Sequence, residues 1–244
     1  MIQMKDKQIL INGKPELIIA GEIHYFRLPP KDWQDRIDKL KAAGANAVAS
    51  YIPWLCHEFG EGDFDFNGRL RPEHDLEGFL DLCASNELYF FARPGPFIMA
   101  EMKNEGLPYW LYKKHPEIVP VTWDGKMVST AEVDYLAPNF LKEAKRWYRA
   151  VMGVLRPRLI TNGGNVIAVQ LDNEIGMLAW INNTPVLTDG ALLDFADWLE
   201  KRYDQETLKS RYSVNLHDLH ALRQFYRSPQ EEYVAEFLLD LGYF

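Results

Sequence analysis

Four short apolar runs, each followed at once by polar and aromatic residues, dominate the pattern of this chain. They lie near residues 17–21, 47–51, 88–92 and 166–171. Continuous apolar runs of this length are typical of parallel strands that are covered on both faces. The last run follows a glycine pair and ends in a carboxylate, an amide and a second carboxylate. We therefore predict four strands whose carboxyl ends are rich in functional groups.

Amphipathic segments with helical spacing separate and follow these runs. In the first, Trp33, Ile37 and Leu40 share one face, Pro29-Pro30 precedes it, and Gly44 marks its end. Further helices are predicted after Asp75, which is suited to cap a helix, and at residues 136–159 and 191–203. Alternating strands and helices indicate an α/β fold of parallel βα units. A strand at residues 8–11 followed by Asn12-Gly13 predicts a short hairpin at the front.

The charge balance and the cysteine count narrow the possible partners. The net charge is −8, and the chain contains no run rich in Lys or Arg, so nucleic acid and anionic membranes are disfavoured. No stretch resembles a signal peptide or could span a bilayer. Cys56 and Cys83 make no disulfide framework and are interpreted as free packing thiols. These features favour a cytoplasmic protein.

Tryptophans occupy several predicted loops after strands. The residues concerned are Trp54, Trp110, Trp123 and Trp180. Exposed aromatic rings near carboxylates and amides are suited to stack on sugars. The alternative is that these rings only cover the end of the sheet, and the sequence leaves both interpretations open.

Five motifs together resemble glycoside hydrolase family 35, the β-galactosidases. They occur in the family's order and at its spacing, and they span roughly residues 9–180. The segment near residues 195–216 is more similar to the related family 42. The five motifs are Gly21-Glu22-Ile23-His24-Tyr25-Phe26-Arg27, Tyr51-Ile52-Pro53-Trp54 with His57-Glu58, Arg93-Pro94-Gly95-Pro96-Phe97 with Ala100-Glu101, Gly106-Leu107-Pro108, and Ile167-Ala168-Val169-Gln170-Leu171-Asp172-Asn173-Glu174.

The resemblance implies a retaining exo-glycosidase that acts on a galactoside or oligosaccharide, needs no cofactor or metal, and has a TIM (β/α)8-type barrel. Glu174 corresponds to the general acid/base, which has to hold a proton near neutral pH. Asn173 would hydrogen-bond the sugar hydroxyl next to the anomeric carbon. Tyr51, Ala100 and Glu101 would line the pocket for the terminal galactose.

Two departures from the family pattern leave the sugar open. Family members usually carry Cys-Ala-Glu-Trp after the Pro-Gly-Pro loop, whereas this chain has Met99-Ala100-Glu101-Met102. The missing tryptophan alters the expected rim of the pocket. Asp172 is interpreted as a residue that orients Asn173.

The resemblance places the catalytic nucleophile on a seventh strand, and no such strand is predicted here. Residues 191–244 keep helical spacing almost throughout. We therefore expect residues 1–244 to form the N-terminal half of a barrel with about four strands and to be inactive alone. Its open sheet edges are expected to favour aggregation or association, including association as a homo-oligomer. Two alternatives stay open: a related barrel glycosidase for another sugar, such as a β-glucosaminidase, and a non-catalytic sugar-binding half-barrel.

Other polar residues near the strand ends have structural interpretations. His24, His57 and Glu58 lack the spacing of metal ligands, and His24 is expected to be a hydrogen-bonded core residue. Glu22 and Glu58 are carboxylates at the same end, but neither is assigned as the nucleophile. Arg93 is expected to neutralise neighbouring carboxylates.

Overall fold

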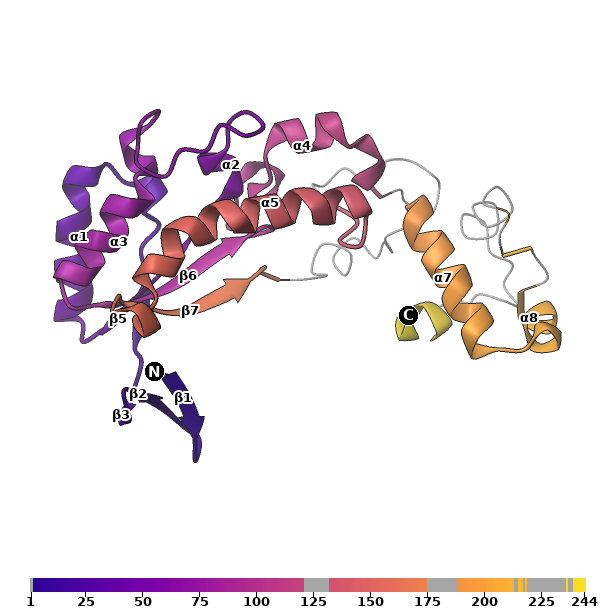
Figure 1. The fold of residues 1–244 in the computed structure, drawn as a ribbon, viewed down its shortest axis with the longest axis horizontal. Coiled ribbons are helices and arrows are strands. Elements are labelled where there is room, and N and C mark those ends of the chain that lie inside the picture. The colour runs from indigo at the N-terminus through magenta and orange to yellow at the C-terminus, as the bar shows by residue number, and fades with distance from the viewer. Residues whose placement is uncertain are drawn as a thin grey trace. The chain divides into compact units, whose positions relative to one another are not determined.

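The computed structural model describes residues 2–120, 132–174, 188–212, 215–216, 218, 236 and 239–244. The chain divides into two compact units (Figure 1). The first comprises Met1–Leu111 and Ala144–Ile175, and the second comprises Tyr112–Glu143 and Gly176–Phe244. Each unit is considered by itself below. That the whole chain forms one portion of a catalytic barrel stays a prediction.

A parallel four-stranded sheet forms the centre of the first unit. Its strands are β4 (Ala20–Glu22), β5 (Ala47–Tyr51), β6 (Tyr89–Gly95) and β7 (Val166–Leu171), and they pair in the order β4-β5-β6-β7. All five residues of β5 are buried, as a strand covered on both faces requires. This confirms the predicted α/β fold and its four parallel strands.

The first of these strands begins later than predicted. Residues 17–19 lie outside β4, and both Leu17 and Ile19 are exposed. The side chain of Asn46 accepts a hydrogen bond from the Ile19 N–H at 2.8 Å and donates one to the Leu17 carbonyl at 2.9 Å. These side-chain contacts occupy backbone groups of the segment just before β4.

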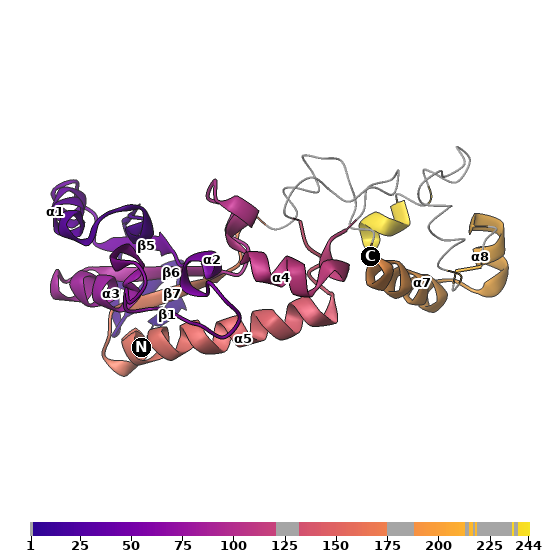
Figure 2. The ribbon, with the colours of Figure 1, turned by 90° about the horizontal axis from the view of Figure 1, so that it is seen from above.

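Helices cover the parallel sheet. α1 (Trp33–Ala42) and α3 (Leu76–Ser85) lie side by side, and α5 (Pro138–Leu155) runs along the sheet beside β6 and β7 (Figures 1 and 2). Asp75 caps α3 by accepting from the Gly78 N–H at 2.9 Å, as predicted. The remaining helices of this part of the chain are α2 (Trp54–His57) and α4 (Tyr109–Lys114). Short 3-10 turns are η1 (Tyr25–Arg27), η2 (Pro30–Asp32), η3 (Pro72–His74), η4 (Lys103–Gly106), η5 (Pro116–Ile118), η6 (Arg156–Arg158) and η7 (Ile160–Asn162).

Aromatic rings make up much of the core around the sheet. Tyr25 stacks on Phe79 with 5.2 Å between ring centroids, and the edge of Phe79 meets Phe90 of β6. Trp54 stacks on Trp147 at 5.7 Å, and both rings are fully buried. Burial of such large rings provides much of the hydrophobic stabilisation of a domain of this size.

A separate antiparallel sheet precedes the parallel one. Its strands are β1 (Ile2–Lys5), β2 (Gln8–Ile11) and β3 (Lys14–Glu16), in the order β1-β2-β3. Asn12 and Gly13 both have positive φ, 52° and 80°, which is the conformation of a type I′ hairpin turn. The predicted hairpin is therefore present, and β1 adds a third strand.

In the second unit, helices carry a small core of their own. They are α7 (Asp189–Arg202) and α8 (Gln205–Tyr212), and the Thr188 side chain caps α7 by accepting from the Ala191 N–H. Buried Asp240 accepts hydrogen bonds from the hydroxyls of Tyr203 and Tyr212. The core consists of Leu192, Phe195, Ala196, Leu199, Leu208, Tyr212 and Leu216. Within the helical pattern predicted over residues 191–244, positions 213, 214, 217, 219–235, 237 and 238 lie outside the described residues.

Both cysteines are buried free thiols, as predicted. Burial raises the pKa of Cys56 and of Cys83 to about 12, so neither thiol ionises readily near neutral pH.

Within the part of the chain that the structure describes, no helix is long and apolar enough to cross a membrane.

The free energy of unfolding is expected to depend on the protonation of His57. This fully buried ring contacts the Asp65 carbonyl through Nδ1 at 2.6 Å and the Tyr25 hydroxyl through Nε2 at 2.5 Å. Because a carbonyl only accepts, Nδ1 carries the hydrogen and Nε2 accepts from the tyrosine. Burial lowers the pKa of His57 to about 4, against about 6.5 in the unfolded chain. The unfolded state therefore binds more protons between these two values, and stability falls as pH falls from 6.5 to 4.

The measurement is chemical denaturation of the wild type and His57→Asn at several pH values. We expect this histidine alone to account for about 3 kcal/mol of the loss between pH 6.5 and pH 4. The destabilisation caused by the substitution should shrink by that amount over the same interval. A destabilisation that is the same at pH 7 and at pH 4 would contradict this assignment.

Candidate active site

The carboxyl ends of the four parallel strands meet at one edge of the sheet. Glu22 ends β4, Tyr51 ends β5, and Arg93 and Gln170 lie near the ends of β6 and β7. In parallel barrels this end of the sheet carries the catalytic groups. The sequence placed its candidate residues here, and the structure brings these strand ends together.

Arg93 connects all four strand ends. Its guanidinium donates to Glu22, to the Tyr51 hydroxyl at 2.6 Å, to Gln170 Oε1 at 2.9 Å and to Asn173 Oδ1 at 2.9 Å. The guanidinium carbon also lies 3.8 Å from the centroid of the Tyr51 ring. These contacts confirm that Arg93 neutralises a neighbouring carboxylate. They also make it the residue that fixes the positions of the side chains around it.

Asn173 is held from three sides. Its side-chain oxygen accepts from Arg93, and also from Gln170 Nε2 at 2.9 Å, while its Nδ2 donates to the Ile98 carbonyl at 3.0 Å. The Asp172 side chain accepts from the Asn173 backbone N–H at 3.1 Å, so it contacts the main chain, and its role in orienting the Asn173 side chain stays a prediction. Asn173 is only 7% exposed. A buried amide with this many partners has a defined position and orientation.

Glu174 and Glu101 lie in the same region of the site, and both side chains are exposed. The charges of both carboxylates raise the pKa of the Tyr51 phenol, although burial of the ring is the larger cause. Burial, followed by the charges of Glu101 and Glu174, also raises the pKa of Glu105. The charges of the two carboxylates that the sequence singled out therefore both act on Tyr51 and on Glu105.

The loop that carries Ala100 and Glu101 has an unusual backbone. Met99, Ala100 and Glu101 have φ values of 58°, 53° and 49°, in the left-handed region that residues other than glycine rarely adopt. Arg27 donates a hydrogen bond to the Ala100 carbonyl. Ala100 itself is buried at 9% exposure. Local strain of this kind is found where surrounding contacts hold a functional loop in place.

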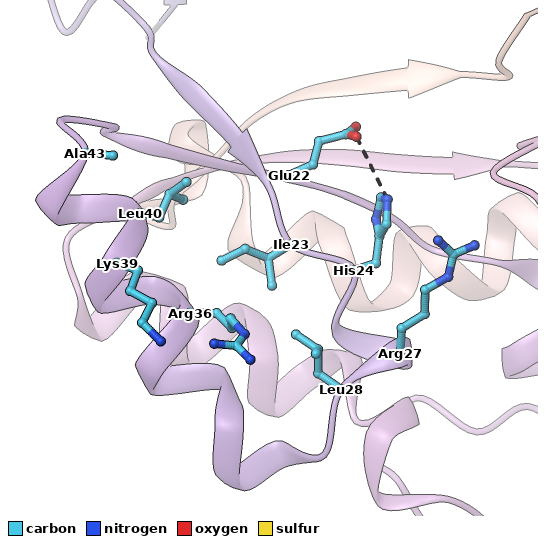
Figure 3. Close-up of a pocket in the computed structure, with 9 residues that line it drawn as sticks. All are labelled: Glu22, Ile23, His24, Arg27, Leu28, Arg36, Lys39, Leu40 and Ala43. Atoms are coloured by element: carbon cyan, nitrogen blue, oxygen red, sulfur yellow. Dashed lines mark ion pairs between the residues drawn. The ribbon is translucent and has the colours of Figure 1, made fainter.

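His24 lies beside this site, on the segment after β4. Its ring lies 5.2 Å from that of Tyr51, and its Nε2 is 3.9 Å from Glu22 (Figure 3). Burial, followed by the charge of Arg27, lowers the pKa of His24, while Glu101 opposes this shift. Its Nδ1 is buried without a hydrogen-bond partner among the described residues. His24 was expected to be a hydrogen-bonded core residue; the structure places it near the mouth and partly buried, with Nε2 facing Glu22 and no described partner for Nδ1.

A hollow lies between residues 22–28 and α1, and Figure 3 draws the residues that line it. It is lined by apolar groups such as Ile23 and Leu40, with Glu22 and His24 at one end. The residues with predicted site roles, Tyr51, Ala100, Glu101, Asn173 and Glu174, do not line it. The hollow therefore adjoins the strand-end site through Glu22 and His24 and does not include the residues predicted to act on the sugar.

Glu58 has a structural position. It is fully buried, and it accepts hydrogen bonds from Trp54 Nε1 at 2.5 Å, from the Gly62 N–H at 2.6 Å and from Arg146 at 2.5 Å.

Trp54 is fully buried, so it cannot stack on a sugar. Its burial supports the alternative that this ring covers the end of the sheet. Trp123 and Trp180 lie outside the described residues. Among the described residues, no group of three His, Cys, Asp or Glu side chains is arranged to hold a metal ion.

Two residues of the site were missed by the sequence analysis. Gln170 was given no role beyond its place in a strand motif, yet it hydrogen-bonds both Arg93 and Asn173. Glu105 was given no role at all, yet its pKa responds to the charges of Glu101 and Glu174. A usable signal existed for Gln170, because a lone amide in an otherwise apolar strand needs a polar partner. No such signal marks Glu105.

Comparison with known proteins decides the family. Residues 8–215 match the model of "Glycosyl hydrolases family 35". The chain belongs to this family. Family 35 membership confirms the resemblance inferred from the five motifs, and it accounts for the concentration of polar groups at the strand ends.

The curated relatives that this chain resembles carry names that state different reactions. The chain is 36% identical to a beta-1,2-glucosyltransferase of Ignavibacterium album over 89% of its length, and 37% identical to an exo-beta-D-glucosaminidase of Thermococcus kodakarensis over 89%. It is 37% identical to the bovine beta-galactosidase over 72% of its length. The alignments span 31%, 29% and 24% of these relatives, respectively. The chain thus spans about a quarter to a third of the length of the curated relatives it matches.

A solved structure supports the fold. The beta-galactosidase of Marinomonas ef1 superimposes with a TM-score of 0.62, covering 81% of this chain and 27% of that protein, at 17% sequence identity. Together with the family match, the parallel sheet and its helices correspond to part of a (β/α)8-type barrel, as predicted. At this identity the likeness concerns the fold alone.

Proposed function

We propose that this chain supplies the acid/base half of a retaining exo-glycosidase site for terminal β-linked sugars. The observation that carries the proposal is the gathering of Glu101, Glu174, Asn173 and Tyr51 at the carboxyl ends of four parallel strands. Together they provide an exposed carboxylate to move a proton and buried polar groups to hold a sugar. Family membership supports a glycoside hydrolase, and the resemblance of the motifs supports the roles of the individual residues.

Glu174 is proposed as the general acid/base. It follows buried Asn173 directly, so the network that fixes Asn173 also fixes the start of the segment that carries Glu174. Its side chain is exposed, so it can reach the oxygen of a leaving group bound at this end of the sheet. A general acid protonates that leaving oxygen and then, as a base, activates water.

The remaining site residues are proposed to bind the sugar in the subsite next to Glu174. Exposed Glu101 would accept from sugar hydroxyls, and the Ala100 backbone lies beside it. The Tyr51 hydroxyl accepts from Arg93, so its own hydrogen is free to be donated toward the carboxylates or a sugar oxygen. Aromatic Tyr51 also gives the pocket an apolar wall.

The nucleophile is proposed not to be a carboxylate of this chain. A retaining mechanism needs a second carboxyl group about 5–5.5 Å from the first. Glu58 is fully buried among donors, and Glu22 is paired with Arg93. Glu101 is assigned to sugar binding. Family resemblance places the nucleophile on a later strand.

Covalent labelling tests this assignment. We expect that a 2-deoxy-2-fluoro galactosyl fluoride, which traps the glycosyl-enzyme of retaining enzymes, leaves the mass of the 244-residue chain unchanged. An inactive reagent with hydroxyl in place of the leaving fluoride controls for non-specific adducts. A stoichiometric adduct on Glu101 or on any other carboxylate of this chain would show that the nucleophile is present after all.

Two sugars are candidates for the subsite. The resemblance of the motifs favours a terminal β-D-galactosyl residue. A terminal β-glucosaminyl residue is the second candidate, because the exo-glucosaminidase relative aligns over 89% of the chain and bovine beta-galactosidase over 72%. A panel of nitrophenyl β-glycosides, assayed with a version of the enzyme that carries the complete barrel, separates them. Turnover of none of these sugars would contradict the proposed function.

A further inference from the structure

We propose that Asp172 is a positioning residue, whose carboxylate binds the loop that carries Glu101 to the segment that carries Glu174. The two carboxylates with proposed roles are thereby held in a fixed relation to each other. This inference rests on the proposed function, because it assumes those two roles. It goes beyond an effect on the neighbouring Asn173, since the partner of Asp172 in the loop is Phe97, 75 positions earlier in the chain.

One carboxylate oxygen of Asp172 receives two backbone donors. Its Oδ1 accepts from the Phe97 N–H at 3.0 Å and from the Asn173 N–H at 3.1 Å, which is within the acceptor capacity of a carboxylate oxygen. Phe97 is buried and lies shortly before Glu101, and Asn173 directly precedes Glu174. A single atom therefore joins the backbones of both segments.

The main chain of Asp172 contacts the same loop a second time. Its N–H donates to the Gly95 carbonyl at 2.9 Å, and the Tyr148 hydroxyl of α5 donates to that carbonyl as well. Asp172 has a φ of 81°, a left-handed conformation that Asp adopts more readily than most residues other than glycine. An aspartate at this position therefore suits both the backbone conformation and the contacts.

The loop that Asp172 contacts needs support from outside. The residues of the loop that have positive φ without being glycine are Met99, Ala100, Glu101, Asn104 and Glu105. Each of them raises the conformational energy of the backbone, so surrounding contacts have to hold the loop in this form. Arg27, the Asn173 side chain and the Asp172 carboxylate each hydrogen-bond its backbone from another part of the chain. Asp172 is thus one of three supports, and it is the one that also binds the segment leading to Glu174.

Removing the Asp172 carboxylate would leave two backbone N–H groups without this acceptor. Phe97 is only 4% exposed, and a buried N–H without a partner is costly, so the loop should shift to satisfy it. Glu101 would then move with the loop, relative to Glu174. A displacement of about 1 Å in the groups that position a substrate costs about 10²-fold in rate. Asp172 therefore acts on catalysis through the placement of Glu101.

The test uses the enzyme with its complete barrel and the dinitrophenyl glycoside that it turns over best. Because this aglycone leaves without a proton, kcat/KM depends on sugar binding rather than on the general acid. Asp172→Gly removes the carboxylate but tolerates a φ of 81°, and it should lower kcat/KM about 10–100-fold. Asp172→Asn keeps an oxygen that accepts from both N–H groups, and it should stay within about fivefold of the wild type.

A double-mutant cycle with Glu101→Gln separates positioning from a general effect on folding. If Asp172 acts through Glu101, Asp172→Gly should cost no more than about threefold in a protein that already lacks the Glu101 carboxylate. Asp75→Ala is the matched control, since Asp75 also accepts from a backbone N–H, that of Gly78 in α3. Its effect on kcat/KM should be below about threefold and the same with and without Glu101→Gln. Thermal melting shows whether each variant is folded.

Amide hydrogen exchange in the 244-residue chain tests the contact without catalysis. The Phe97 and Asn173 N–H groups should exchange slowly in the wild type and at least about tenfold faster in Asp172→Gly. Ile52 is the reference, because its N–H donates to the Arg93 carbonyl at 2.9 Å and should be unaffected. A wild-type Phe97 N–H that exchanges as fast as an exposed amide would overturn the inference, even if Asp172→Gly did not fold.

Fully additive losses in folded Asp172→Gly and Glu101→Gln would also overturn the inference, as would equal losses in Asp172→Asn and Asp172→Gly. Both results would leave the proposed function intact. Turnover of no glycoside by the enzyme with its complete barrel would count against the proposed function itself, and the catalytic part of the inference would fall with it.

Discussion

Replacing Glu174 with Gln is expected to lower turnover of a lactose-like substrate by about 10²–10⁴-fold. The measurement uses a version of the enzyme that carries the complete barrel. A sugar hydroxyl is a poor leaving group, so departure of the aglycone depends on a proton from the general acid. Glutamine keeps the size and polarity of the side chain but cannot supply that proton. The residue sits next to the fixed amide of Asn173, so the substitution should leave the surrounding geometry in place.

The loss should depend on the leaving group. With a dinitrophenyl glycoside, whose aglycone leaves unaided, formation of the glycosyl-enzyme should be nearly unaffected by Glu174→Gln. Deglycosylation would then limit turnover, because the same residue has to activate water. Glu105→Gln is a useful control, since Glu105 lies near the same charges but has no proposed role in proton transfer. Any loss in that variant should be the same for good and poor leaving groups.

The second large effect concerns stability. Glu58→Gln should destabilise the fold by about 3–5 kcal/mol, because it leaves Arg146 without its buried partner. Glu58 is completely buried and also accepts from Trp54 Nε1 and from a backbone N–H. Glutamine brings an NH₂ group into a place where the described hydrogen-bond partners of the carboxylate are all donors. Chemical denaturation at neutral pH measures the change in the free energy of unfolding.

Asp81→Asn is the matched control for Glu58. It removes a carboxylate from the Arg158–Asp81 pair, in which Asp81 is 65% exposed, and should change the free energy of unfolding by no more than about 1 kcal/mol. If Glu58→Gln were as mild as this control, the carboxylate would not be a structural anchor. Glu58 would then have to be considered again as a catalytic carboxylate.

Much of the local structure could be predicted because it depends on neighbours in sequence. Apolar spacing places Trp33 and Ile37 on the buried face of α1, and both are buried. Asp75 caps α3 through Gly78, three residues on. The four strands follow from continuous apolar runs. The exception is the start of β4, where the side chain of Asn46 binds the backbone of residues 17 and 19 instead.

The site could be predicted only in part, because its geometry depends on contacts between distant residues. The sequence suggested that strand ends converge, but the connections that Arg93 makes to three other strands span 42 to 80 positions. Trp54 illustrates the same limit. It follows a strand and could have faced a sugar, yet Trp147 of α5 stacks on it and buries it. Neither outcome is encoded in the spacing of nearby residues.

The central claim is that Glu174 is the acid/base of a retaining glycosidase, and azide rescue of Glu174→Gln tests it most directly. Azide attacks the glycosyl-enzyme without help from a general base. With a dinitrophenyl β-galactoside, added azide should raise turnover of the variant and yield galactosyl azide with the β configuration. No acceleration, together with equal loss on every leaving group, would contradict the claim. Glu174 would then be the nucleophile or a structural residue.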